Sequence, residues 1–202
     1  AQGILAGLNA ALYARGDEGW TPRRDEAYLG VMVDDLTTKG VTEPYRMFTS
    51  RAEYRLSLRE DNADARLTPT GRRLGLVDDL RWEYFNRKTE RVQRALEMLK
   101  DTWVNPKIIA AAEAERVLGT SIEREYPLRS LLARPNVRMS DLATLRRTDG
   151  TLAADFSELN EVEKAQVEVE VKYAGYVERQ KDEIEKALAN ETLAIPDAMD
   201  YD

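Results

Sequence analysis

The sequence of 202 residues contains neither cysteine nor histidine. Without cysteine the chain can form no disulfide framework, no thiolate nucleophile and no cysteine-based metal cluster. Without histidine it lacks the commonest general base and the commonest protein ligand of transition metals. Together these two absences exclude most familiar active sites. We therefore expect this chain to carry no catalytic residue of its own.

Long apolar stretches are missing as well. No run approaches the roughly 18 residues that a membrane-spanning helix requires, and no signal peptide opens the chain. Hydrophobic residues make up 43% and charged residues 33% of the sequence, which is typical of a soluble globular protein with much exposed helix. The length allows one large domain or two small ones. A cytoplasmic location fits this composition.

The glycines form no motif that binds phosphate or metal. The stretch Gly3-Ile-Leu-Ala-Gly7 lacks the glycine order of a dinucleotide-binding loop, no strand precedes it, and the chain has no P-loop. The acidic "DNAD" at 61–64 lacks the glycine and the final glutamate of a calcium-binding loop. We therefore expect this chain to bind neither a cofactor nor a metal.

Charge is unevenly distributed along the chain. Residues 1–100 hold 17 Lys and Arg against 16 Asp and Glu, a net charge of +1, whereas residues 101–202 hold 13 against 21, a net charge of −8. An anion-binding surface is therefore expected in the first half. In residues 155–202, 14 acidic residues stand against 5 basic ones. This excess indicates a solvated helix face or, alternatively, an acidic surface for a partner.

The pattern of apolar residues predicts a mainly α fold with long paired helices and short connectors. Two stretches leave an alternative open, because "YLGVMV" at 28–33 could be a buried strand and the alternating "VEVEVKY" at 167–173 a half-exposed one. Helices are expected over residues 1–16, 22–39, 69–74, 79–100, 106–118 and 127–133, after Ser140, and over 157–190. By composition the chain divides into three regions: a first helix (1–16), an Arg-rich region (17–102) and an acidic region ending in a long helix (103–202).

The Arg-rich region contains a group of basic residues that the sequence places close together. Ser50 followed by Glu53 is a capping-box pattern and predicts a helix that starts at Ser50. Arg51, Arg55 and Arg59 would then lie on one face of that helix, between two apolar edges, because they are four residues apart. Arg46 and Lys39 add basic character nearby.

Guanidinium groups in such a sheltered place need partners, since an unpaired buried charge is costly. The partners could be internal, supplied by the neighbouring carboxylates Asp34, Asp35, Asp61 and Asp64. They could instead be phosphates of a nucleic acid or dinucleotide, which arginine binds with its planar fork. Three nearby rings could stack on a base or belong to the core. These rings are Tyr45, Phe48 and Tyr54.

Two stretches of the sequence closely resemble one protein family. Residues 1–12, "AQGILAGLNAAL", and residues 25–68, with "EPYRMFTSRAEYRL" and "LREDNADARLT", resemble the MnmG (GidA) family of flavin-dependent tRNA-modifying enzymes. "GLVDD" and "VKYAGYVERQKDEIEK" extend the likeness, which is weak over residues 103–155. The resemblance implies a C-terminal fragment. Residues 1–16 would end the FAD-binding domain, whose remainder and NADH-binding insertion are not in this chain, and a last helical segment would also be missing.

The resemblance also implies a function. Members use FAD, NADH and a folate one-carbon donor and work with the GTPase MnmE. Together they add an aminomethyl or carboxymethylaminomethyl group to carbon 5 of the wobble uridine of tRNA. They are homodimers, and their helical C-terminal region is linked to contact with tRNA and MnmE.

For this chain we therefore expect docking of tRNA and protein partners, with no cofactor of its own. Arg46 and Arg55 stand where the family has arginines associated with tRNA handling, whereas Arg51 and Arg59 join them through the predicted helix alone. The alternative is a helical protein-interaction scaffold, contacting MnmE or a second subunit, whose arginines are structural.

Overall fold

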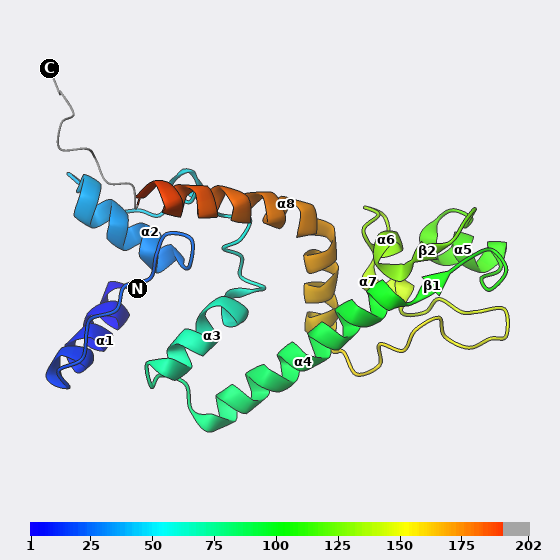
Figure 1. The fold of residues 1–202 in the computed structure, drawn as a ribbon, viewed down its shortest axis with the longest axis horizontal. Coiled ribbons are helices and arrows are strands. Elements are labelled where there is room, and N and C mark those ends of the chain that lie inside the picture. Colours follow the sequence, from blue (N-terminus) through cyan, green and yellow to red (C-terminus); the bar gives the residue numbers. More distant parts are fainter. Residues whose placement is uncertain (192–202) are drawn as a thin grey trace, which may run out of the picture. The chain divides into compact units, whose positions relative to one another are not determined.

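The computed structural model describes residues 1–191 and shows a mainly α-helical chain (Figure 1). Within these residues one small sheet pairs β1 (Trp103–Val104) antiparallel with β2 (Tyr126–Pro127). The α-helices are α1 (Gln2–Ala14), α2 (Tyr28–Asp34), α3 (Ala63–Arg73), α4 (Asp79–Asp101), α5 (Ala111–Leu118), α6 (Leu128–Leu132), α7 (Met139–Leu142) and α8 (Glu161–Glu191). A π-helical turn, Asp35–Lys39, extends α2, and a 3-10 turn covers Thr49–Arg51.

Contacts within the chain define two compact units. The first unit comprises Ala1–Leu67 with the part of α8 from Tyr176 onward, and the second unit is Thr68–Gly175. Residues 101–105, where the composition turns acidic, lie inside the second unit. The division into regions 17–102 and 103–202 rests on composition and stays a prediction.

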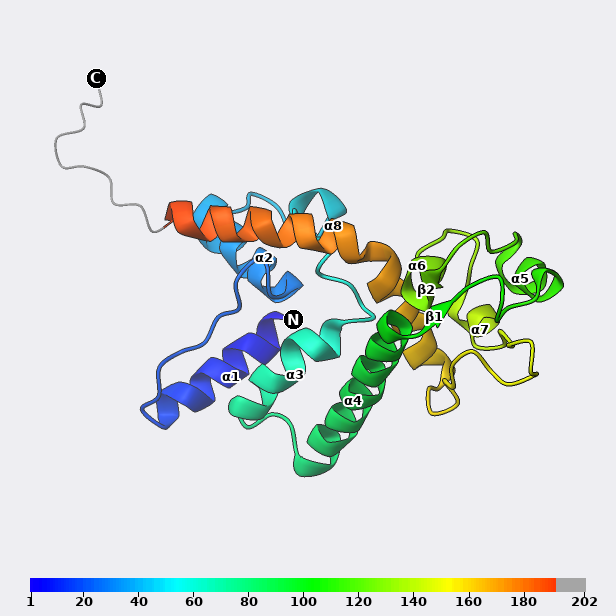
Figure 2. The ribbon, with the colours of Figure 1, turned by 45° about the vertical axis from the view of Figure 1, so that its right-hand side comes forward.

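The second unit is organised around α4. Asp78 caps this helix by accepting a hydrogen bond from the Arg81 amide at 2.7 Å, and the buried face includes Phe85, Val92 and Leu99. Figure 2 shows α4 leading into β1, beside α6 and β2. A connected apolar cluster from α4, α5, α6, α7 and the first turns of α8 forms the core. Burial of this apolar surface is the main force that holds the second unit together.

The first unit buries far fewer apolar side chains. One close approach fixes its geometry: a Cβ at Gly30 would lie 2.1 Å from the carbonyl oxygen of Arg23, so only glycine lets α2 pack against that segment. Polar contacts supplement the packing. The Gln180 Oε1 of α8 accepts hydrogen bonds from the Ser57 amide at 2.8 Å and the Ser57 hydroxyl at 2.7 Å. The buried apolar side chains of this unit are Leu8, Leu12, Ala27, Val31, Met32, Ala52 and Leu58.

Several helices agree with the sequence patterns. The predicted helix over 79–100 is α4, and the stretches "YLGVMV" and "VEVEVKY" are helical, as favoured over the strand alternatives. Gly40 and Gly119, both at positive φ, end the elements that the sequence expects them to end.

Three helices begin five or six residues away from their predicted starts. The helix expected from Pro22 begins at Tyr28, because the Glu26 carboxylate accepts from the Arg23 amide and closes a turn there. The helix expected from Pro69 begins at Ala63, where the Arg66 side chain bonds three neighbouring groups. The helix expected from Pro106 begins at Ala111, after a turn closed by the side chain of Asn105.

The predicted arginine helix is absent from this part of the chain. Residues 49–51 form a 3-10 turn, Ala52 is extended, and the next α-helix begins at Ala63. The reason is tertiary. The Glu53 carboxylate pairs with Arg24 instead of capping Ser50, and the Glu53 carbonyl and Ser57 amide both bond to Gln180. These contacts use groups on which a helix from Ser50 would depend.

Candidate nucleic-acid interface

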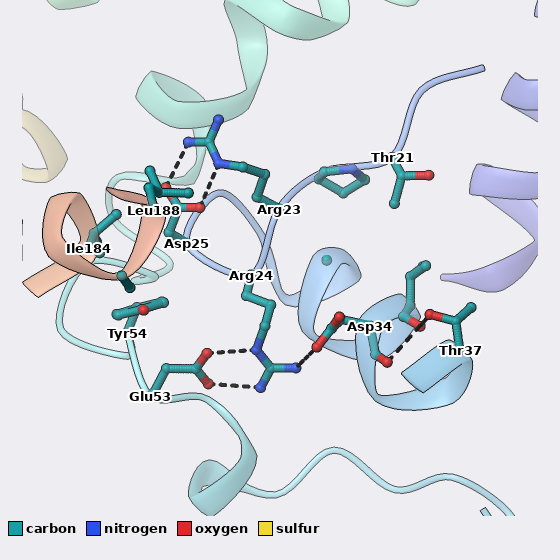
Figure 3. Close-up of a pocket in the computed structure, with 14 residues that line it drawn as sticks. Thr21, Arg23, Arg24, Asp25, Asp34, Thr37, Glu53, Tyr54, Ile184 and Leu188 are labelled. Carbon is teal, nitrogen blue, oxygen red and sulfur yellow. Dashed lines mark hydrogen bonds and ion pairs between the residues drawn. The ribbon is translucent and has the colours of Figure 1, made fainter. Parts of the chain in front are cut away.

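Arg24 is the centre of a charge network in the first unit. Its Nε and Nη2 donate to the two carboxylate oxygens of Glu53 at 2.6 and 2.8 Å. Its Nη1 donates to Asp34 at 2.8 Å and Asp35 at 2.9 Å, and its Nη2 also donates to the Arg51 carbonyl at 3.0 Å. Five acceptors match the five N–H groups of a guanidinium. Figure 3 shows Arg24 held between Glu53 and Asp34.

Asp35 is the buried acid of this network, with only 1% of its surface exposed. Besides Arg24, it accepts from the Tyr45 hydroxyl at 3.0 Å and from Arg51 Nη1 at 3.3 Å. The Nζ of Lys39 lies 3.7 Å from its Oδ1. Burial by itself would raise the pKa of Asp35, but the hydrogen bonds from Arg24, Tyr45 and Arg51 outweigh it and lower that pKa. Asp35 therefore stays ionised inside the fold.

The other carboxylates respond to the same arginine. The bidentate contact with Arg24 lowers the pKa of Glu53, against the opposing effect of partial burial. The neighbouring anions also raise the pKa of Arg24, with Glu53 contributing most. The network thus joins α2 and its π-helical turn, through Arg24, to the segment that follows the 3-10 turn.

The structure divides the predicted arginines into two pairs. Arg51 and Arg59 are engaged internally: Arg51 donates to Asp35 and lies 5.1 Å from the Tyr45 ring centroid, and Arg59 donates to both carboxylate oxygens of Asp61 at 2.9 and 3.0 Å. The single helical face expected for Arg51, Arg55 and Arg59 is therefore wrong. Asp35 and Asp61 are internal partners, as the alternative interpretation expected, whereas Asp34 pairs with Arg24.

Arg46 and Arg55 are the other pair, and both are exposed. Among residues 1–191, no ion pair involves either guanidinium. The Arg46 guanidinium lies 5.3 Å from the ring centroid of Phe48, a cation–π distance. Lys39 is also exposed, and its ion pair with Asp35 is long. Binding of nucleic acid by these residues stays a prediction.

A pocket of about 390 Å³ lies next to the network, between its charged groups and α8 (Figure 3). Arg23 and Arg24 line it, but Arg23 donates to both oxygens of Asp25 and Arg24 is saturated. Its apolar wall includes Tyr54, Ile184 and Leu188. Because the cations in its wall already have carboxylate partners, this pocket is a poor phosphate site.

Sequence reasoning missed Arg24 as the central residue of the region. The only signal was the charge-dense "PRRDE" at 22–26, which gives no partner at long range. Across residues 1–191 no cluster of three acidic side chains is arranged to hold a metal ion. None of the helices described is both long and apolar enough to cross a membrane.

The described residues define a mainly α-helical protein whose candidate site is a network of arginines and carboxylates. Residues 79–181 match the family described as the tRNA modifying enzyme MnmG/GidA C-terminal helical domain. The chain belongs to this family, which confirms the resemblance seen in its sequence.

Solved structures agree with this assignment. The structure of Aquifex aeolicus GidA in its form II crystal is 40% identical in sequence, with a TM-score of 0.74, and covers 99% of this chain. The form I crystal gives 38% identity and a TM-score of 0.73, also over 99% of this chain. This chain covers 30% and 29% of those two chains, so it spans less than a third of their length.

Proposed function

We propose that this chain is the tRNA- and partner-docking region of a flavin-dependent enzyme that modifies carbon 5 of the wobble uridine of tRNA. In this proposal FAD and NADH bind to parts of the enzyme outside this chain. The aminomethyl or carboxymethylaminomethyl group is added together with MnmE, in a homodimeric cytoplasmic enzyme. Membership of the MnmG/GidA family supports the proposal.

The observation that best supports the docking role is the exposure of the Arg46 and Arg55 side chains. Both guanidiniums are exposed and take part in no ion pair within residues 1–191, although the first unit supplies carboxylates to Arg24, Arg51 and Arg59. An exposed guanidinium with unused donors fits the oxygens of an RNA phosphate, which it can bind in bidentate fashion.

The test is binding of substrate tRNA to the complete enzyme at several salt concentrations. Arg46→Ala and Arg55→Ala should each weaken binding by about 10-fold and flatten the plot of log affinity against log salt by about 0.7–0.9 for each phosphate that is no longer neutralised. Arg81→Ala, which removes an exposed arginine from α4 in the second unit, is the matched control and should have a smaller effect. Unchanged affinity and slope for both first-unit variants would contradict the proposal.

A helical protein-interaction scaffold is the second candidate, and the internal pairing of Arg51 and Arg59 favours it. In that case the acidic face of α8 would contact MnmE or a second subunit. Arg55→Ala would then leave tRNA affinity unchanged, whereas Arg51→Ala would lower thermal stability through the lost contact with Asp35. Replacing the exposed acids Glu178, Glu183 and Glu185 of α8 with Gln would abolish capture of MnmE while leaving tRNA binding intact.

A further inference from the structure

We infer that Phe48 is a stacking platform for an unpaired base of the bound RNA, with Arg46 beside it. This inference rests on the proposed function. It adds a contact that distinguishes single-stranded RNA from paired RNA. It starts from the exposure of Phe48, which is 48% open to solvent. Leaving a large ring in water forgoes the stabilisation that burial would give.

The neighbouring rings contact groups that are held within the protein, whereas the ring contact of Phe48 is with an exposed side chain. The Tyr45 hydroxyl donates to the buried Asp35, and the guanidinium of Arg51 lies over its ring. Tyr54 is half-buried and lines the pocket beside α8. Phe48 has no polar side-chain atom to bond internally, and its ring contact with a cation is to Arg46, which is itself exposed.

The backbone holds Phe48 in a defined position. Its carbonyl accepts from the Arg51 amide at 3.0 Å, so the residue starts the 3-10 turn while its own backbone is extended at φ −106° and ψ 152°. Arg51 is fixed in turn by Asp35. An exposed ring on a held backbone gives up little conformational freedom on binding, which suits it to stacking.

The combination of ring and cation points to nucleic acid. Arg46 can bind a phosphate while the adjacent ring accepts the face of a base, the pairing used by proteins that bind single-stranded RNA. A base inside a paired stem has no face available for the ring. The ligand class is therefore an unpaired nucleotide, such as one in a tRNA loop.

The experiment uses the complete enzyme and two RNAs: a tRNA anticodon stem-loop with a fluorescent adenine analogue in the loop, and a fully paired duplex made from the same stem. Phe48→Leu keeps the apolar bulk but removes the ring, and should weaken stem-loop binding by about 10-fold. It should leave duplex binding and the salt slope unchanged, because the net charge stays the same. Phe48→Trp keeps an aromatic ring, and should therefore retain the affinity lost in Phe48→Leu and the stacking-dependent quenching of the analogue.

Met47→Ala is the control, since Met47 is a neighbouring exposed apolar residue without a ring. Equal weakening for both RNAs, failure of Phe48→Trp to restore binding, or a defect confined to MnmE capture would each overturn the inference. The arginine variants separate it from the proposed function. If Arg46→Ala and Arg55→Ala weaken binding but Phe48→Leu does not, only the stacking inference is wrong.

Discussion

The two units differ in the interactions that stabilise the interior of each. The second unit has a connected apolar core that includes Leu99, Leu118 and Leu132, all fully buried. The first unit buries only a few apolar side chains. Within residues 1–191 each unit also buries one charged acid: Asp35, which accepts from Arg24 and other donors in the first unit, and Glu163, which accepts from Arg91 in the second. Apolar burial is non-directional, whereas charged hydrogen bonds demand defined distances and angles. In the unit that carries the candidate interface, directional hydrogen bonds take the place of part of the apolar burial. These hydrogen bonds orient the segment around the 3-10 turn.

The largest expected effect is in the second unit. Leu132→Ala should lower the free energy of unfolding by about 3 kcal/mol, because it opens a cavity in a core where this side chain is fully buried. Denaturant unfolding with amide exchange would measure the destabilisation unit by unit. Leu80→Ala, at a residue that is 78% exposed in the same unit, is the control and should change little. Equal loss of amide protection in both units would contradict the contrast.

A smaller effect, confined to the first unit, is expected for Asp35→Ala. This change removes the acceptor of Arg24, Tyr45 and Arg51 and should cost about 2 kcal/mol, moderated by the partial exposure of the two arginines. Amides around the 3-10 turn should lose protection while those of α4 keep it. Asp34→Ala, which removes one hydrogen bond from a side chain that is 40% exposed, is the matched control and should cost less. Similar destabilisation by the two variants would argue against Asp35 as the central acid.

The smallest expected effect is a loss of folding stability at acidic pH. Hydrogen bonding to Arg116 lowers the pKa of Glu113 from 4.5 to about 2, and the pKa values of Asp35 and Glu53 are also lowered. A carboxylate whose pKa is depressed in the folded state stabilises the fold above its ordinary pKa, and this contribution disappears as pH falls from about 4.5 towards about 2. For Glu113, discounted for the exposed Arg116, we expect about 1 kcal/mol.

An acid titration followed by amide exchange checks this expectation. The first unit should lose protection at a higher pH than the second, because it buries less apolar surface that could offset the loss of its ionised carboxylates. Glu113→Gln should reduce the acid dependence of the second unit only. Simultaneous unfolding of both units at one pH would remove the distinction between them.

How far the sequence could be interpreted depended on the range of the contacts. α4 was predictable nearly to its ends because its cap and apolar spacing are local. Residues 50–59 were not, since Glu53 meets Arg24 and Ser57 meets Gln180, partners 29 and 123 residues away. Arg46 and Arg55 were singled out through the family motif, but their exposure could not be known from it. Arg24 was missed because nothing near it in sequence reveals five acceptors.

The sequence by itself determined the helical class, the family and the absence of cysteine and histidine chemistry, because periodicity, motifs and composition are written residue by residue. Only the tertiary structure decided which guanidiniums are engaged within the protein and which are exposed. Arg51 and Arg59 meet Asp35 and Asp61, while Arg46 and Arg55 form no ion pair within residues 1–191. The physical reason is that a charge is neutralised by whatever acid the fold brings within about 4 Å of it, and that distance is set by the packing of segments far apart in the chain.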